Sequence, residues 1–205
     1  MNMIYHLFWD SSHSGDELYN ARLVKFPDFE SAVGLMSTRE LKLPDTVYFE
    51  ADFKVLQKTD FPTNDSNWPL MSSRMLKILT AHQSFKYRII PVVMLNSTIS
   101  PKERSDDLGQ PKKEYADYDF SALYLLEHLD AFDWDKSEYI PHKRLPNKVS
   151  SISKLVLKTP EGGFPPIFRL SVKSSYLFVS REIKEELEKN DIKGVQFFEL
   201  SQIVV

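Results

Sequence analysis

The stretch that most constrains the fold runs from Tyr176 to Leu200, YLFVSREIKEELEKNDIKGVQFFEL, and predicts a strand, a short helix and a second strand. Its first four residues are apolar and β-prone, and Ser180 can accept a hydrogen bond from a backbone N–H at the start of a helix. Ile183 and Leu187 lie four residues apart, on one face of that helix. Gly194 can adopt the positive φ needed before the β pattern resumes. The stretch predicts a packing unit without catalytic chemistry.

An earlier stretch, Trp68–Leu95, follows a similar order. When Ser73 is aligned with Ser180, Arg74 meets Arg181, and an amphipathic helix again leads from a serine to a strand. The likeness indicates a repeated arrangement. The alternative is that two unrelated helices each begin with a serine cap.

Several other stretches alternate apolar and polar residues with the period of a β-strand. Met3–Trp9 is apolar on both faces, which predicts a strand that is covered on both. Val47–Phe53 and Tyr118–Leu126 alternate clearly. Pro91 cannot donate to a sheet, so we expect an edge or a bulge at this position of the strand Tyr87–Leu95.

Two later stretches, Leu155–Leu157 and Ile167–Val172, predict neighbouring strands, with Arg169 and Ser171 facing outward. Residues 29–36 fit either a short helix or a strand. Strands and short helices alternate irregularly along the chain, which favours an α+β fold, a mostly antiparallel sheet with a few short helices packed on it.

The clearest break in the chain is the polar, charged stretch Asn96–Glu114, which contains Pro101, Gly109 and Pro111. We expect residues 1–205 to form a single α+β domain, or two lobes joined near 96–114. The basic residues of this break, among them Arg104, are expected to be solvated.

Composition excludes several classes of protein. The 205 residues carry 26 basic and 29 acidic side chains, a net charge of −3 that is too mild to predict a nucleic-acid partner. The chain has no cysteine, which excludes disulfides, thiolate metal sites and cysteine nucleophiles and suits a reducing cytoplasm. The N-terminus lacks the features of a signal peptide, and no stretch approaches the about 20 apolar residues of a membrane span. We therefore expect a cytoplasmic protein without a membrane partner.

Catalytic motifs are missing from the sequence. It contains neither a glycine-rich phosphate loop nor a G-x-S-x-G elbow, and the five histidines lack the spacing of a helical metal site. We expect no catalytic residues, no cofactor and no metal site. Glu50 and Asp52 lie on one face of a predicted strand, and a dispersed carboxylate site with His6 or His82 is the enzymatic alternative; a solvated sheet face explains these acids as well.

Acidic residues are concentrated in Glu127–Tyr139, EHLDAFDWDKSEY. The spacing of its aspartates and the lack of a glycine argue against a calcium loop. Two interpretations remain, a capped irregular connection with Trp134 tucked in, or an acidic patch offered to a partner. An exposed aromatic side chain beside carboxylates makes a good anchor on a basic partner surface. The candidate partner-binding residues are Asp133, Trp134, Asp135 and Glu138, and more weakly Trp68 and Asp65; the alternative for both groups is a core tryptophan beside solvated acids.

The segment 124–139, YLLEHLDAFDWDKSEY, resembles the signature segment of a bacterial family that was first catalogued as a domain of unknown function. That family was later placed among the immunity proteins of polymorphic toxin systems. Residues 10–43 match no part of the family pattern. Other landmarks stand in family order: Met3–Trp9, Pro69–Arg74, Ile89–Leu95, Leu129-Asp130, Lys136–Glu138, Ile167–Leu170 and the closing stretch from Leu177 to Leu200.

The resemblance implies a bacterial immunity protein that is made beside a toxin, binds this cognate toxin and neutralises it by occlusion. Such a protein needs no catalytic residues, and we expect it to be a monomer or a dimer. A non-catalytic scaffold or regulatory binding module is the first alternative, and an enzyme with a dispersed carboxylate site is the second.

Overall fold

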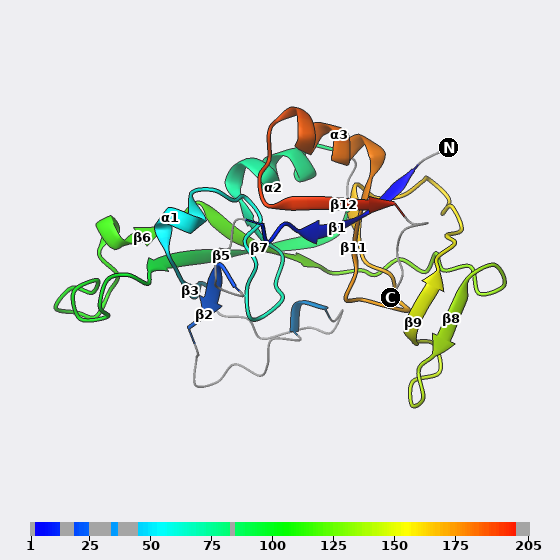
Figure 1. Ribbon diagram of the computed structural model, residues 1–205, viewed down its shortest axis with the longest axis horizontal. Helices are drawn as coiled ribbons and strands as arrows, with labels where there is room; N and C mark the ends of the chain where they lie inside the picture. The colour runs from blue at the N-terminus through cyan, green and yellow to red at the C-terminus, as the bar shows by residue number, and fades with distance from the viewer. Residues whose placement is uncertain (1–2, 13–18, 25–33, 37–44, 83–84, 200–205) are drawn as a thin grey trace.

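The computed structural model describes residues 3–12, 19–24, 34–36, 45–82 and 85–199. These residues form mostly antiparallel sheets with a few short helices packed on them, which confirms the predicted α+β class (Figure 1). Most of the segment 29–36 lies outside the described residues; its end, Gly34–Met36, is a 3-10 turn, η1. The division into one domain or two lobes stays a prediction.

The first strand occupies the middle of a four-stranded antiparallel sheet with the order β10-β11-β1-β12. In β1, Tyr5 lies opposite Val179 of β11 on one side and Glu199 of β12 on the other. Ile4 and Leu7 are both buried although they point to opposite faces of the sheet, which confirms the prediction of a strand covered on both sides. The four strands are β1 (Ile4–Trp9), β10 (Ile167–Phe168), β11 (Leu177–Ser180) and β12 (Val195–Glu199).

The second sheet has six strands in the order β2-β3-β5-β7-β4, with β6 also paired to β5. Among the strands of the described residues, β3 and β5 are the parallel pair. Pro91 is the last residue of β5 that pairs with β7, and pairing with β3 begins at Val92. The missing N–H therefore falls where the strand has one partner, which is locally an edge. The strands are β2 (Ala21–Leu23), β3 (Val47–Ala51), β4 (Leu70–Ser72), β5 (Tyr87–Asn96), β6 (Ala116–Asp117) and β7 (Phe120–Leu125).

A two-stranded ribbon, β8 (Glu138–Pro141) with β9 (Val149–Lys154), stands at the opposite end of the molecule from the loop that precedes β6 (Figure 1). That loop ends in a 3-10 turn, η2 (Lys113–Tyr115). The short helix α1 (Phe53–Leu56) follows β3. The stretches 155–157 and 167–172, predicted as neighbouring strands, are separated by residues 129–132: Phe132 bridges Leu157, and Leu129 bridges Leu170.

Helices α2 (Ser73–Thr80) and α3 (Arg181–Lys189) pack side by side on one face of the molecule (Figure 1). Ser180 caps α3 by accepting a hydrogen bond from the backbone N–H of Ile183, and Gly194 has φ +79°, as predicted. The cap of α2 is Ser72, which accepts from Met75 N at 3.3 Å. The serine equivalent to Ser180 is therefore Ser72, and the alignment through Ser73 was wrong by one residue.

A central core joins the two sheets beneath α2 and α3. It draws apolar side chains from both helices and from strands of both sheets, so that neither helix buries its apolar stripe against one sheet alone. Two further clusters fill the far side of the six-stranded sheet and the space between the four-stranded sheet and the β8–β9 ribbon. The buried members of the central core include Tyr5, Leu7, Met71, Met75, Leu79, Leu123, Leu125, Val179, Ile183 and Leu187.

Two arginines expected in solvent are buried. Arg104, in the loop between β5 and β6, forms an ion pair with Glu50 of β3 and donates to the carbonyl of Asn96 at 3.3 Å. The cost of burying this guanidinium is offset by these acceptors, so the basic residues of the loop are not a uniformly solvated group. Arg169 is only 3% exposed. Strand β10 ends at Phe168, so the alternation of inward and outward side chains that predicted an exposed Arg169 does not extend to this residue.

Asp60 connects the start of α2 to the turn that follows α3. Its buried carboxylate accepts hydrogen bonds from Ser72 Oγ at 2.6 Å, from Arg74 Nε at 2.6 Å and from the backbone N–H of Lys193 at 2.8 Å. Arg74 also donates to the carbonyls of Asn190 and Asp191, each at 3.1 Å. Segments more than 100 residues apart in sequence are thus held by one carboxylate and one guanidinium.

Candidate functional site

The predicted acidic segment is a capped, irregular connection between β7 and β8. Asp133 is buried, and its carboxylate accepts hydrogen bonds from the backbone N–H groups of Asp135 at 3.1 Å and Lys136 at 3.2 Å. Ser137 continues the turn by accepting from Val156 N at 3.0 Å. Asp133 therefore shapes the turn, and its carboxylate is directed at the backbone rather than at solvent.

Trp134 is half-buried in a small aromatic group. Its ring meets Phe132 at a centroid distance of 4.8 Å and Tyr139 at 5.2 Å, both in edge-to-face geometry. Asp135 and Glu138, which follow it in sequence, are exposed, and neither forms an ion pair with a residue that the structure describes. We call Trp134, Asp135 and Glu138 the Trp134 patch. It combines a rigid, partly accessible aromatic side chain with two available negative charges.

Of the two weaker candidates for partner binding, Trp68 lies in the core and Asp65 lies at the surface. Trp68 is 0% exposed and meets Phe49 at a ring distance of 6.0 Å, so its indole is a core side chain, as the alternative interpretation had it. Asn64 holds the Trp68 backbone by accepting from its N–H at 2.9 Å and donating to its carbonyl at 2.8 Å. Asp65 is exposed, and its carboxylate accepts from the backbone N–H of Leu23 at 2.9 Å.

The acids of the enzymatic alternative have separate structural roles. Glu50 pairs with Arg104, while Asp52 caps α1 by accepting from Lys54 N at 2.8 Å. His6 lies on β1 in the other sheet, and His82 is exposed after the end of α2. Within the described part of the chain, no group of three or more metal-ligating side chains comes together. These residues do not form a dispersed carboxylate site.

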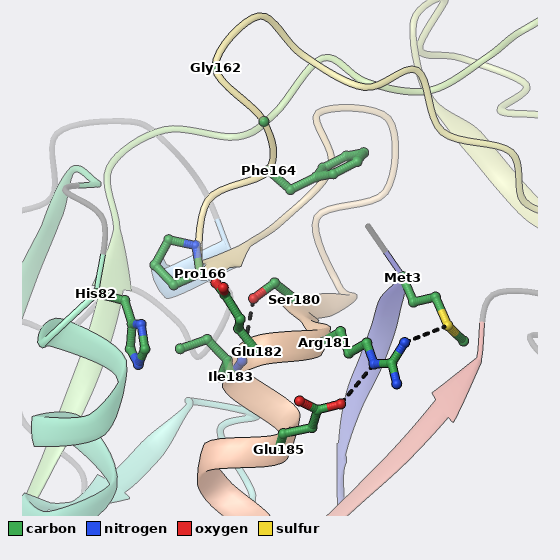
Figure 2. Close-up of a pocket in the computed structure, with 11 residues that line it drawn as sticks. Met3, His82, Gly162, Phe164, Pro166, Ser180, Arg181, Glu182, Ile183 and Glu185 are labelled. Carbon is green, nitrogen blue, oxygen red and sulfur yellow. Dashed lines mark hydrogen bonds and ion pairs between the residues drawn. The ribbon is translucent and has the colours of Figure 1, made fainter. Parts of the chain in front are cut away.

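A polar pocket of about 280 Å³ lies at the start of α3 (Figure 2). Figure 2 shows Arg181 directed toward Met3, Glu185 directed toward Arg181, and Glu182 on the other side, directed toward Pro166. Arg181 donates to Glu185 at 2.7 Å, and this hydrogen bond raises the pKa of Arg181 above its ordinary value. His82, just after the end of α2, also borders the pocket.

This pocket has no assembled acid–base pair. Among the described residues, His82 has no hydrogen bond to Glu182 or Glu185, and Arg181 is occupied by Glu185 and the sulfur of Met3. The hydroxyl of Ser180, which also lines the pocket, is engaged as the cap of α3, and the charged side chains can recognise polar groups of a partner surface.

Sequence reasoning missed both this pocket and the buried position of Arg169. The pocket is assembled from four separated stretches, around Met3, His82, Gly162–Pro166 and Ser180–Glu185. No local spacing indicates that they meet, because their proximity depends on the packing of α2 against α3. None of the helices formed by the described residues is long and apolar enough to cross a membrane.

Comparison with known proteins gave one family. Residues 109–202 match the model of the Immunity protein family (Imm11), which confirms the resemblance to an immunity-protein family. The matched segment begins in the loop before β6 and contains β6 to β12, α3 and the Trp134 patch. No curated protein matches the chain. The family match supports an immunity role and suggests a non-catalytic one.

Proposed function

We propose that this chain is an immunity protein that binds a cognate bacterial toxin and neutralises it by covering the toxin's working surface. The observation that carries the proposal is the match of residues 109–202 to an immunity protein family. Occlusion requires a complementary surface and no chemistry. The separate structural roles of Glu50 and Asp52 support this form of inhibition over an enzymatic one.

The toxin-binding surface that we propose is the Trp134 patch. Its indole is held by two aromatic neighbours, so little side-chain entropy is lost when a partner packs on it. Asp135 and Glu138 carry negative charges and form no ion pair with any basic residue that the structure describes. Such charges steer and orient a basic partner. Asp133 contributes by fixing the turn. Trp68 lies in the core and takes no part in this surface.

The function is tested by expressing the chain together with the toxin encoded beside it, in cells that the toxin otherwise kills. We expect survival, and a complex of the two proteins that survives size-exclusion chromatography. Continued killing with both proteins present and folded would contradict the proposal. Survival without a detectable complex would contradict occlusion. The cytoplasmic location and the monomeric or dimeric state stay predictions, and the same chromatography measures the latter.

The surface is tested by charge reversal. In Asp135→Lys with Glu138→Lys, we expect the toxin to bind at least about tenfold more weakly, mainly through slower association, because two steering charges change sign. Glu161→Lys is the matched control, since Glu161 is an exposed acid within the same family-matched segment. Calorimetry or surface plasmon resonance measures the affinities. Equal loss of affinity in the control, or none in the double variant, would place the toxin elsewhere.

A further inference from the structure

Arg169 is a buried cation without a counter-charge among the described residues. Its Nη1 donates to the carbonyl of Ser174 at 2.6 Å, but its Nε has no hydrogen-bond partner. It forms no ion pair with any residue that the structure describes, and burial lowers its pKa to about 10, which still leaves it charged at neutral pH. A buried guanidinium is unfavourable unless acceptors surround it, so this side chain has unused capacity for an anion.

The guanidinium lines a cavity of about 350 Å³ between β1 and the segment that precedes β11. The other walls are largely aromatic. His6 meets Tyr176 edge-on at 4.9 Å, and Trp9 stacks on Phe61 at 5.5 Å. This volume is within the range of small-molecule sites, which are typically apolar with a few placed polar groups.

A second buried donor without a partner belongs to a residue that lines this cavity. Trp9 lines it, and its Nε1–H has no hydrogen-bond partner in the described structure. No aspartate or glutamate is among the lining residues. His6 adds no positive charge at neutral pH, because burial, and secondarily the charge of Arg169, lower its pKa to about 4. The cavity is therefore lined by one cation, Arg169, and by no carboxylate.

Phe8 connects this cavity to the surface. Its side chain both lines the cavity and is exposed, and it forms a tilted or edge-on pair with His6, Trp9 and Phe198. The cavity therefore meets the surface beside Phe8.

We propose that this cavity binds a small organic monocarboxylate with an aromatic or aliphatic body. The carboxylate accepts charge-assisted hydrogen bonds from the Arg169 guanidinium, and the body packs among Trp9, Phe61 and Tyr176. Such a ligand supplies the missing counter-charge and fills apolar volume at once. The proposal does not depend on toxin binding, because it rests on Arg169 and the walls of the cavity and not on the Trp134 patch.

The test uses 3-phenylpropanoate as the probe and 3-phenylpropanamide as its neutral counterpart. The readout is the indole N–H resonance of Trp9 in nitrogen-15 NMR spectra, identified by its absence in Trp9→Phe. We expect the carboxylate to shift this resonance in a saturable manner, leaving those of Trp68 and Trp134 unmoved, and to bind at least tenfold more tightly than the amide.

Two variants make the test specific. Arg169→Gln should weaken binding of the carboxylate at least tenfold, whereas Arg144→Gln, an exposed arginine outside the cavity, should not change it. If Arg169→Gln fails to fold, Ser175→Leu replaces it, because Ser175 is an exposed residue that lines the cavity and a larger side chain there should exclude the probe. No shift of the Trp9 resonance in the unmodified chain, equal affinity for acid and amide, or unchanged binding in the cavity variants would overturn the proposal.

Discussion

Replacing Asp60 with alanine should destabilise the fold by about 3–4 kcal/mol, because its carboxylate is shared by three separate donor residues. The variant leaves the buried Ser72 hydroxyl and the Lys193 N–H without their acceptor. Each unsatisfied donor costs roughly 1–3 kcal/mol, with the lower end fitting the partly buried Lys193 N–H. The side chain of Arg74 is 53% exposed and can return to water, so its loss of the ion pair adds little.

The assay is urea unfolding followed by circular dichroism, with thermal melts as a second measure. For a chain of this length, a loss of about 3–4 kcal/mol corresponds to a fall of roughly 6–16 °C in the melting temperature. Asp60→Asn should fall between alanine and the native residue. The amide oxygen of asparagine can still accept a hydrogen bond. All partners of the carboxylate are donors, however, so the amide NH₂ would face one of these donors and leave it without an acceptor.

Two controls decide the interpretation. Asp135→Ala removes an exposed carboxylate and should change stability by less than about 0.5 kcal/mol. Arg74→Ala should cost about 1 kcal/mol, since the guanidinium is half-exposed and its raised pKa comes first from its hydrogen bond with Asp60. If Asp60→Ala costs less than about 1 kcal/mol, or no more than Arg74→Ala, then the buried donors are satisfied by water and the reasoning is wrong.

Three further perturbations test other parts of the fold. Gly194→Ala should cost more than about 1 kcal/mol in urea unfolding, because φ is +79° and the added Cβ would collide with Thr59 Oγ1; a neutral result would mean that this turn relaxes freely. Trp68→Ala should cost about 3–5 kcal/mol by the same assay, since the side chain is fully buried, and a cost under about 1 kcal/mol would contradict its core position. His6 has a folded pKa of about 4, below its ordinary 6.5, so the stability from its neutral form is complete above pH 6.5 and is lost as the pH falls toward 4. Stability measured at pH 6.5 and pH 5 should therefore fall by up to about 1.4 kcal/mol per pH unit through this residue. His6→Phe should show a smaller fall, and an identical pH dependence in the two proteins would exclude His6 as its source.

The parts of the fold that sequence predicted correctly depend on local physics. Ser180 caps a helix because its hydroxyl reaches an N–H three residues away, and Gly194 adopts a positive φ that other residues avoid. The strand around Tyr5 and Leu7 was recognisable because both of its faces are apolar. Interactions of this range can be found without knowing which strands meet.

The errors lie where distant segments decide the outcome. Ser72 and Ser73 are equally good caps in sequence, but both the backbone N–H and the hydroxyl of Ser73 donate to the carbonyl of Asp119, before β7. Arg169 follows strand alternation in sequence, yet it lines a cavity formed with residues of β1. In the candidate site, the irregular turn around Trp134 was predicted as one of two alternatives. The burial of Asp133 was not, because it depends on hydrogen bonds to backbone N–H groups that the pattern of apolar and polar residues does not reveal.

The central position of β1 limits how the molecule can be divided. The segment 109–202 contains β11 and β12 but not the strand that separates them. Expressed alone, that fragment would expose two unsatisfied strand edges and lose the apolar side chains of Tyr5 and Leu7 from the central core. We therefore expect truncation mapping to yield aggregated fragments, and point substitutions in the intact chain are the sounder way to locate what it binds. The same arrangement is expected to slow folding, since the partners of β1 lie 170 residues or more further along the chain.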